Sequence, residues 1–346
     1  MPRTNMKYPA KTDVTVLLLF FNRPDTFGQV FEQVRLARPS RLFLYQDGPR
    51  GERDMMGIKA CRQIVSDENI DWECEVRRMY QEKNYGCDPS GYMSHKWAFS
   101  IADKCIVLED DVVPSQSFFP FCKEMLDRYE NDPRVTMIAG FNTDEETSDV
   151  PDSYFFTSVF SIWGWASWRR VVDQWDDSYS FIRDKYNMRQ LEALVKQRKY
   201  KPDMLRMFND HSQSGKAYFE TIFWSTMLFQ SGLAIMPTKN QINNVGLTAN
   251  STHYSASLET TPRGLRRIFT MQRKELEFPL KHPKYVIENV SYKERLYRRN
   301  AWGHPWIKIG RSLEELWLNV RYGNWAFIGR SVLRRIRILT GREKFS

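Results

Sequence analysis

Short apolar runs alternate with amphipathic stretches through the first 140 residues of the chain. Apolar runs of four to eight residues predict buried strands, and apolar positions three or four apart predict helices. The predicted strands span 15–21, 41–46, 72–79, 105–108 and 135–139, and the predicted helices span 26–37, 55–65, 87–102 and 115–128. Strands that alternate with helices predict an α/β fold with a mostly parallel central sheet flanked by helices.

The pattern changes after residue 140. Residues 142–152 are polar, and residues 154–168 are rich in aromatic and small side chains, which predicts loops that shape a pocket. Helices are predicted at 188–200, 202–210 and 217–231, with a short strand at 233–236. From about residue 260 the chain becomes basic and irregular. We therefore expect one large domain, 1–258, followed by a basic, amphipathic helical extension, 259–346.

Three consecutive carboxylates, Glu109, Asp110 and Asp111, directly follow the apolar run at 105–108. They are predicted to lie at the C-terminal end of a strand, where open α/β sheets bind their ligands. Adjacent carboxylates repel one another, and a divalent cation that also binds phosphate oxygens relieves this repulsion. The sequence therefore predicts a Mg²⁺ or Mn²⁺ site, with a solvated acidic turn as the alternative.

The composition of the 346-residue chain is that of a globular protein, with 42% hydrophobic and 14% aromatic residues. Its five cysteines show no Cys-x-x-Cys spacing, which predicts reduced thiols, no zinc site and a cytoplasmic location. The first apolar run is short and no small-residue cleavage site follows it, so we interpret it as a strand and not as a signal peptide. No run reaches the roughly 20 apolar residues that a membrane-spanning helix needs.

The formal charge of +9 is concentrated toward the C-terminus. Residues 301–346 contain nine Lys or Arg and three Glu, a net charge of +6, interleaved with tryptophan, leucine and isoleucine. Basic and aromatic residues on an amphipathic helix predict contact with an anionic membrane surface, so we expect a peripheral protein on the inner face of the cell membrane. The alternative is that the apolar residues pack on the larger domain. No motif for nucleic-acid recognition accompanies the charge, so no nucleic-acid partner is expected.

Four features at the ends of the predicted strands together resemble the GT-A glycosyltransferases, which are nucleotide-sugar enzymes with a Rossmann-like half. They are Phe21-Asn22-Arg23-Pro24 after the first strand, Asp47 after the second, the turn Asn84-Tyr85-Gly86 and the triple acid. The triple acid and the Val112-Val113-Pro114-Ser115 that follows it are especially similar to N-acetylglucosaminyltransferase I and its bacterial relatives. The resemblance covers residues 14–253.

The resemblance implies roles for these residues toward a UDP-sugar and a divalent cation. Asp111 would bind Mn²⁺ or Mg²⁺ directly, while Asp110 and Glu109 would contact ribose, sugar or metal-bound water. Asp47 would accept hydrogen bonds from uracil or ribose. The other residues expected at the nucleotide-sugar are Phe21, Asn22, Arg23 and Asn84. Breaking the bond between sugar and diphosphate leaves negative charge on the phosphate, which a bound metal stabilises.

An inverting transfer also needs a carboxylate that takes the proton of the attacking acceptor hydroxyl. Glu220 is the candidate, because it lies in the first turn of a predicted apolar helix and resembles the acidic position found there in inverting GT-A enzymes. Where the family often has Glu-Asp, this chain has Glu220-Thr221. A glutamate favoured by the helix dipole is the structural alternative, and Asp144 and Glu145 are rival candidates for the base.

Two further segments resemble bacterial polysaccharide glycosyltransferases. The segment Trp163-Gly164-Trp165-Ala166-Ser167-Trp168 is similar to their Trp-Gly-Trp-Ala-x-Trp signature. This implies that Trp163 and Trp165 stack on a sugar, and core packing is the alternative. Asn243-Asn244-Val245-Gly246 followed by Ser251-Thr252-His253 is similar to the end of the same domain. That similarity implies that His253 binds the metal or the diphosphate, whereas a loop histidine is otherwise structural or solvated.

These features predict a metal-dependent, inverting glycosyltransferase. We expect it to move a hexose or N-acetylhexosamine from a UDP-sugar to a saccharide acceptor, including one on a polyprenyl diphosphate carrier, in the assembly of a bacterial surface polysaccharide such as a capsule. One alternative is a sugar nucleotidyltransferase, although the loop 21–24 lacks the glycines of a phosphate-binding loop. The other is a non-enzymatic basic protein that binds membranes or nucleic acid, for which the three acids would be dispensable.

Overall fold

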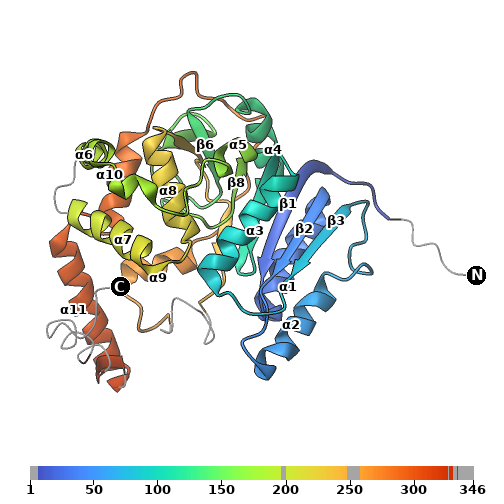
Figure 1. Cartoon of the computed structure of the whole chain (residues 1–346), viewed down its shortest axis with the longest axis horizontal. Coiled ribbons are helices and arrows are strands. Elements are labelled where there is room, and N and C mark those ends of the chain that lie inside the picture. The colour runs from blue at the N-terminus through green and yellow to red at the C-terminus, as the bar shows by residue number, and fades with distance from the viewer. Residues whose placement is uncertain (1–6, 196–199, 248–257, 326, 330–332, 334–346) are drawn as a thin grey trace, which may run out of the picture. The chain divides into compact units, whose positions relative to one another are not determined.

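A computed structural model describes the chain except residues 1–6, 196–199, 248–257, 326, 330–332 and 334–346 (Figure 1). The chain divides into two compact units. The first comprises Met1–Ser178, Lys216–Gly246 and Gln272–Lys293, and the second comprises Tyr179–Gly215, Leu247–Met271 and Glu294–Ser346. This division differs from a single boundary at residue 258, because the segment 272–293, which follows that residue, belongs to the first unit. There, Lys274 N donates to Asn240 O (2.7 Å) and Asn289 N donates to Phe156 O (2.8 Å).

An eight-stranded sheet with the strand order β3-β2-β1-β4-β8-β6-β9-β7 belongs to the first unit, together with a two-stranded sheet of β10 and β5. Strands β3, β2, β1 and β4 pair in parallel, as do β6 and β9, whereas β8 and β7 run antiparallel to their neighbours. The mostly parallel α/β fold expected from the sequence is therefore confirmed. The strands are β1 (Thr12–Phe20), β2 (Pro39–Gln46), β3 (Glu75–Tyr80), β4 (Lys104–Glu109), β5 (Val112–Pro114), β6 (Val135–Ala139), β7 (Tyr154–Thr157), β8 (Trp165–Trp168), β9 (Leu233–Pro237) and β10 (Ile242–Asn244).

Helices of the first unit flank its large sheet (Figure 1). Those of the first unit are α1 (Pro24–Ala37), α2 (Glu52–Ile64), α3 (Cys87–Ile101), α4 (Phe118–Arg128), α5 (Arg169–Val172) and α8 (Phe219–Phe229). Those of the second unit are the 3₁₀ turn η1 (Ser180–Arg183), α6 (Lys185–Leu194), α7 (Lys201–Ser214), α9 (Arg263–Thr270) and α11 (Pro305–Arg321), while α10 (Val290–Arg299) runs from the first unit into the second. In α1 the buried residues Phe27, Val30 and Val34 lie three or four positions apart, so one face of the helix packs on the protein.

The parallel strands end together at one edge of the sheet. Leu19 of β1 is paired with Tyr45 of β2 and with Glu109 of β4. The residues that follow these three strands, at 21–23, 47–48 and 110–111, therefore begin at the same edge. In open α/β sheets this is the edge that binds ligands.

One segment differs from the prediction. Residues 154–168, expected to be loops, contain β7 and β8, and every residue of these two strands is buried. Because strands buried on both faces show no alternation of polar and apolar residues, their aromatic and small side chains resembled a pocket wall. The extension at 259–346, expected to be helical, contains α9, α10 and α11.

All five cysteines are free, in agreement with the expected reduced thiols. Three of them, Cys61, Cys105 and Cys122, are buried and act as small apolar side chains of the core. Within the described part of the chain, no helix combines the length and the apolar character that crossing a bilayer requires.

Candidate active site

The triple acid lies at the C-terminal end of β4, where the sequence predicted it. Glu109 is the last residue of the strand, and Asp110 and Asp111 form the turn into β5. Asp110 is buried, whereas Glu109 and Asp111 are half-buried. Burial raises the pKa of Glu109 well above its ordinary value, and the charges of Asp111 and Glu220 raise this pKa further. Such a cluster favours a bound cation, because each carboxylate makes ionisation of the next one more costly.

Arg23 brings a positive charge to this cluster from the loop after β1. Its Nη2 donates to Asp111 Oδ2 (2.9 Å) and to Asp110 Oδ1, and its Nε donates to Asp110 Oδ2 (3.4 Å). The backbone N–H of Phe21 also donates to Asp110 Oδ2 (3.3 Å). Burial raises the pKa of Asp110 to about 6, although the guanidinium beside it acts in the opposite direction. Both oxygens of Asp110 are thus engaged by the loop after β1.

Asp111 keeps one oxygen that the described residues do not satisfy. Its Oδ1 is buried and accepts no hydrogen bond from any described residue. Its Oδ2 lies against Gly246, since a Cβ at that glycine would be 2.1 Å from this oxygen. Val245 N donates to Asp111 O (2.8 Å), so the chain after β10 closes over the acid. Only glycine permits this approach, and the unsatisfied carboxylate oxygen is a suitable ligand for Mg²⁺ or Mn²⁺.

Glu220 reaches the same cluster from the first turn of α8. Its charge acts on Glu109, which places the two carboxylates in one electrostatic environment. Close packing of α3 on α8 sets this position, because a Cβ on Gly91 would be 2.7 Å from the Phe219 ring. Burial raises the pKa of Glu220 to about 7, and the charge of Asp88 acts in the same direction. A carboxyl group with a pKa near neutrality is suited to general-base catalysis.

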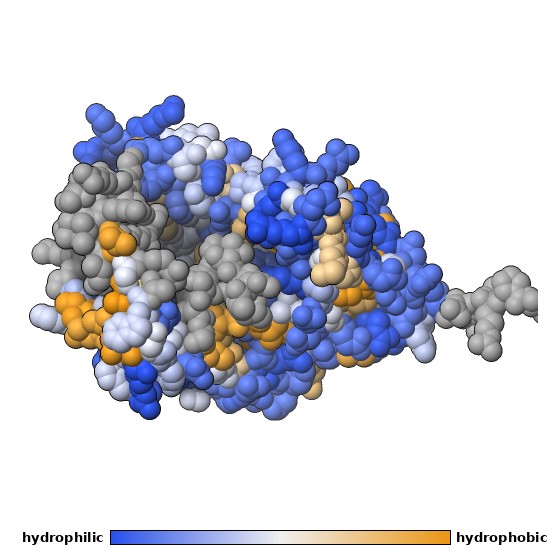
Figure 2. Space-filling view, turned by 90° about the horizontal axis from the view of Figure 1, so that it is seen from below, coloured by the Kyte–Doolittle hydropathy of each residue, from blue (hydrophilic) through white to orange (hydrophobic). Residues whose placement is uncertain are grey.

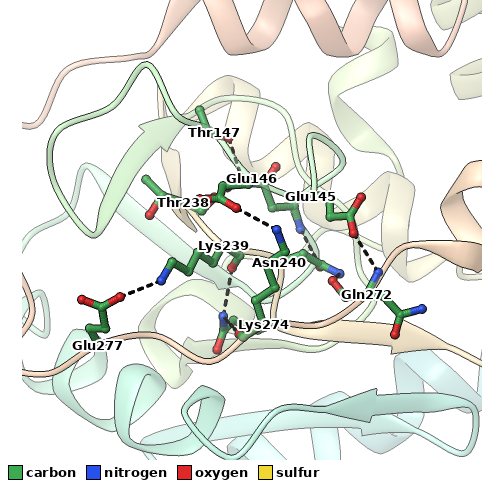
Figure 3. A network of polar contacts seen from close by, with 11 residues as sticks. Glu145, Glu146, Thr147, Thr238, Lys239, Asn240, Gln272, Lys274 and Glu277 are labelled. Carbon is green, nitrogen blue, oxygen red and sulfur yellow. Dashed lines mark hydrogen bonds and ion pairs between the residues drawn. The ribbon is translucent and has the colours of Figure 1, made fainter.

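Asp144 and Glu145, the rival candidates for the base, belong to a different set of contacts. Glu145 Oε1 accepts a hydrogen bond from Gln272 N (3.1 Å), and Glu145 O accepts one from Asn240 N (2.8 Å) (Figure 3). Asp144 Oδ2 accepts a hydrogen bond from Thr147 Oγ1 (3.4 Å). Two ion pairs extend this network, Lys274 with Glu146 (2.7 Å) and Lys239 with Glu277 (3.0 Å) (Figure 3). These contacts tie the loop after β6 to the chain after β9 and give Glu145 a structural role.

Asp47, at the end of β2, is saturated by protein donors. Its Oδ1 accepts hydrogen bonds from the backbone N–H groups of Gly48 (2.9 Å) and Tyr85 (3.0 Å). Its Oδ2 accepts from Asn84 Nδ2 (2.9 Å) and from Gly86 N (3.0 Å). Asp47 thereby holds the turn 84–86 at the start of α3, where Gly86 has a φ of +87°. Contact of Asp47 and Asn84 with a nucleotide stays a prediction.

A network that the sequence analysis missed supports the loop after β1. Asn22 Nδ2 donates to Asp54 Oδ1 (2.8 Å), and Arg50 Nη2 donates to the same oxygen (2.7 Å). The side-chain hydrogen bond from Arg50 lowers the pKa of Asp54 to about 2, and the guanidinium lies 5.0 Å from the centroid of the Phe21 ring. A Cβ on Gly57 of α2 would be 2.3 Å from Asn22 O, so α2 closely supports the loop. In the sequence Asp54 is an ordinary acid in a first helical turn, which carries no signal of this role.

The two tryptophans expected at a sugar lie in different surroundings. Trp165 is 1% exposed, and its ring centroid lies 5.1 Å from that of His95 and 5.2 Å from that of Phe223. Its ring belongs to the core, which is the alternative that the sequence left open. Trp163 is half-buried and lies edge-on to Phe141 (4.8 Å), so part of its surface stays accessible. Sugar contact by Trp163 remains a prediction.

His253 lies outside the described residues, so its expected contact with metal or diphosphate also stays a prediction. Within the described ranges, no group of three or more His, Cys, Asp or Glu has an arrangement that could hold a metal ion. A cation bound at Asp111 would therefore need further ligands from a nucleotide, from water or from the rest of the chain. Mg²⁺ commonly completes its coordination shell with phosphate and water.

No model of a protein family matches this sequence, and no curated protein matches it either. Similar solved structures include mouse xyloside xylosyltransferase 1 in its apo form, with a TM-score of 0.32 and 11% identity over 63% of this chain and 81% of that one. They also include UDP-glucose pyrophosphorylase complexed with UDP-glucose, with a TM-score of 0.29 and 8% identity over 47% of this chain and 78% of that one. A third is the glycosyltransferase GlyE of Streptococcus pneumoniae TIGR4, with a TM-score of 0.28 and 9% identity over 54% of this chain and 40% of that one. The chain spans 55% of a mycobacterial protein that it also matches, and scores this low assign neither a family nor a function.

Proposed function

We propose that the first unit is a metal-dependent, inverting GT-A glycosyltransferase that uses a UDP-sugar. The supporting observation is that the charges of Asp111, Asp110 and Glu220 all act on Glu109, although Glu220 comes from a helix more than 100 residues later in the chain. A candidate ion ligand and a candidate general base thus share one cluster at the ligand-binding edge of an α/β sheet. The sugar is expected to be a hexose or N-acetylhexosamine, and the acceptor a saccharide.

Mn²⁺ or Mg²⁺ fits the donors of this cluster. Asp111 offers a hard carboxylate oxygen that accepts no hydrogen bond from the described residues, and His253 is the second ligand expected from the sequence. When bound, the metal would stabilise the negative charge that develops on the departing diphosphate. Arg23 adds a cation at the same place, and its ion pairs hold Asp110 and Asp111 in fixed positions.

The N-terminus of α3 is the expected position of the diphosphate. Cys87 is the first residue of this helix, and the charges of Glu109 and Glu220 act on its thiol, so the helix start adjoins the acid cluster. The free N–H groups and the dipole at a helix N-terminus favour a bound phosphate. Asp47 would contribute by holding the turn that precedes α3.

Glu220 would act as the general base. As the acceptor oxygen bonds to the anomeric carbon and the bond from that carbon to the diphosphate breaks, the carboxylate takes the proton of the acceptor hydroxyl. A single displacement of this kind inverts the configuration at the anomeric carbon. With a pKa of about 7, Glu220 is partly ionised at neutral pH and is basic enough to accept the proton.

The experiment is a product assay on the full chain with a panel of UDP-sugars, with Mn²⁺ or with EDTA. We expect UDP release that needs the metal and is faster with a saccharide acceptor, and a product whose anomeric configuration is opposite to that of the donor. Retained configuration would contradict the inverting mechanism. Release of pyrophosphate from UTP and a sugar 1-phosphate, without transfer, would instead show a sugar nucleotidyltransferase. No turnover of any UDP-sugar would contradict the proposal.

A further inference from the structure

One face of α11, in the second unit, is a continuous apolar stripe. The six large apolar side chains of this face are between 44% and 80% exposed. At about 100° per residue, their positions fall within an arc of roughly 100°. We call these residues the α11 stripe: Trp306, Ile309, Leu313, Leu316, Trp317 and Val320. Figure 2 shows hydrophobic side chains beside hydrophilic ones in the part of the surface that α11 occupies. An exposed apolar surface of this extent indicates an interaction site.

The remaining sides of α11 are fixed to other helices of the second unit. Leu318 is buried. Lys308 Nζ pairs with Asp203 Oδ2 of α7 (2.5 Å), and Glu314 Oε1 accepts a hydrogen bond from Arg263 N at the start of α9 (3.0 Å). Because these contacts bind the polar sides of α11 to α7 and α9, the stripe on the other side of the helix stays exposed.

Basic charge is concentrated in the same unit. The second unit contains 23 Lys or Arg and nine Asp or Glu, a net charge of +14 over 115 residues. The first unit contains 28 Lys or Arg and 33 Asp or Glu, a net charge of −5 over 231 residues. The smaller unit thus carries all of the positive excess of the chain, which gives it an attraction to anionic surfaces.

We propose that the α11 stripe and the basic charge of the second unit bind this unit to an anionic lipid bilayer, with α11 lying in the interface. Trp306 and Trp317 suit the headgroup region, because an indole ring is largely apolar and carries one polar N–H. Arg321 flanks the stripe, with its guanidinium 5.1 Å from the Trp317 ring centroid. An apolar face bordered by positive charge is typical of helices that bind anionic lipid. This binding does not depend on the activity of the first unit.

A second copy of the chain is the other partner that such a stripe could accept. Five stripe positions follow one another at alternating intervals of three and four residues, as in helices that pair with each other. The net charge of +14 on each copy opposes the approach of two second units, whereas it favours an anionic bilayer. Charge complementarity therefore favours an anionic bilayer, and not a second copy of the chain, as the partner of the α11 stripe.

The experiment is flotation of the full chain with vesicles of phosphatidylglycerol and phosphatidylcholine, compared with vesicles of phosphatidylcholine alone. We expect binding to the anionic vesicles that weakens at high salt. The double substitution Trp306→Ser with Trp317→Ser removes two exposed rings and should lower vesicle partitioning roughly tenfold or more. Met56→Ser is the matched control, because Met56 is 83% exposed on α2 of the first unit, and it should float like the unchanged chain.

Two results would overturn the proposal. One is equal flotation of the double variant and the unchanged chain while circular dichroism shows both to be folded. The other is an absence of flotation together with a dimer in light scattering that the double substitution converts to a monomer, which would assign the stripe to a second copy. Since the replaced side chains are exposed, we expect both variants to fold.

Discussion

Two carboxylate sites at the same edge of the sheet are built in opposite ways. Asp47 accepts four hydrogen bonds from protein donors, so its bonding capacity is filled. In the acid cluster, Glu109 and Glu220 have raised pKa values, and Asp111 Oδ1 accepts no hydrogen bond from the described residues. The first site stabilises a turn, whereas the second retains capacity for a cation or a proton. Position at the ligand edge therefore does not by itself distinguish a structural acid from a candidate catalytic one, whereas unsatisfied oxygens and raised pKa values separate the two sites.

Replacing Asp111 by alanine is the change with the largest expected effect on this comparison. It removes the expected metal ligand, and losing several kcal/mol of transition-state stabilisation lowers transfer about 10³-fold or more. UDP release in the presence of Mn²⁺ measures this loss. The matched control is Asp67→Ala, because the Asp67 side chain is 81% exposed and pairs with Arg78 away from the cluster. Near-normal turnover of Asp111→Ala would refute the metal role.

Glu220→Gln should lower kcat by about 10²- to 10⁴-fold, because glutamine cannot accept the proton. The affinity for UDP should not change. In the unchanged protein the rate should rise as pH increases through about 7 and then level off, since the base acts only when it is deprotonated. An unchanged kcat in the variant would return the base to the loop that contains Asp144.

The substitution Asp47→Ala tests whether Asp47, whose oxygens are saturated by protein donors, has a structural role. It removes the acceptor of the N–H groups of Tyr85 and Gly86, and it leaves Asn84 Nδ2 with Gly48 O as its acceptor. The lost hydrogen bonds should lower the free energy of unfolding by about 2–4 kcal/mol. Urea denaturation measures the change, and Asp67→Ala again serves as the control. If Asp47→Asn were as stable as the unchanged protein yet lost UDP affinity, the nucleotide contact expected from the sequence would replace the structural role.

Glu220→Gln should also stabilise the fold at alkaline pH. The pKa of Glu220 is about 7 in the folded state against an ordinary value of 4.5, so the folded state binds this proton more tightly. The resulting stabilisation is complete below pH 4.5 and is lost as pH rises through 7. At pH 8 the neutral glutamine should therefore be more stable by up to about 3 kcal/mol, with a smaller difference at pH 5. Thermal unfolding that showed equal destabilisation at both pH values would mean that burial of the charge is not the dominant effect.

The sequence predicted the acid cluster better than its surroundings. An apolar run that ends in three acids is a local signal, as is Glu220 in the first turn of an apolar helix, so both could be found from the sequence. The pairing of Arg23 with Asp110 joins residues 87 positions apart, and no local pattern predicts it. The same holds for the close approach of Gly246 to Asp111, which depends on the pairing of β10 with β5.

Trp163 and Trp165 show a second reason why local sequence patterns could not predict the surroundings of every candidate residue. They lie two positions apart in one aromatic segment, yet Trp165 is in the core and Trp163 is half-buried. Strand β8 begins at Trp165 and lies between β4 and β6. The ring of Trp165 is buried because it belongs to this strand, whereas Trp163 precedes the strand and its ring stays partly accessible.

Calorimetric titration of UDP into the full chain, with and without Mn²⁺, tests the proposed metal-dependent nucleotide site most directly. We expect binding that requires Mn²⁺, that is lost in Asp111→Ala and that is unchanged in Asp67→Ala. Equal affinity for UDP with and without the metal, or equal binding by Asp111→Ala and the unchanged chain, would contradict the assignment of the acid cluster to a metal-bound diphosphate.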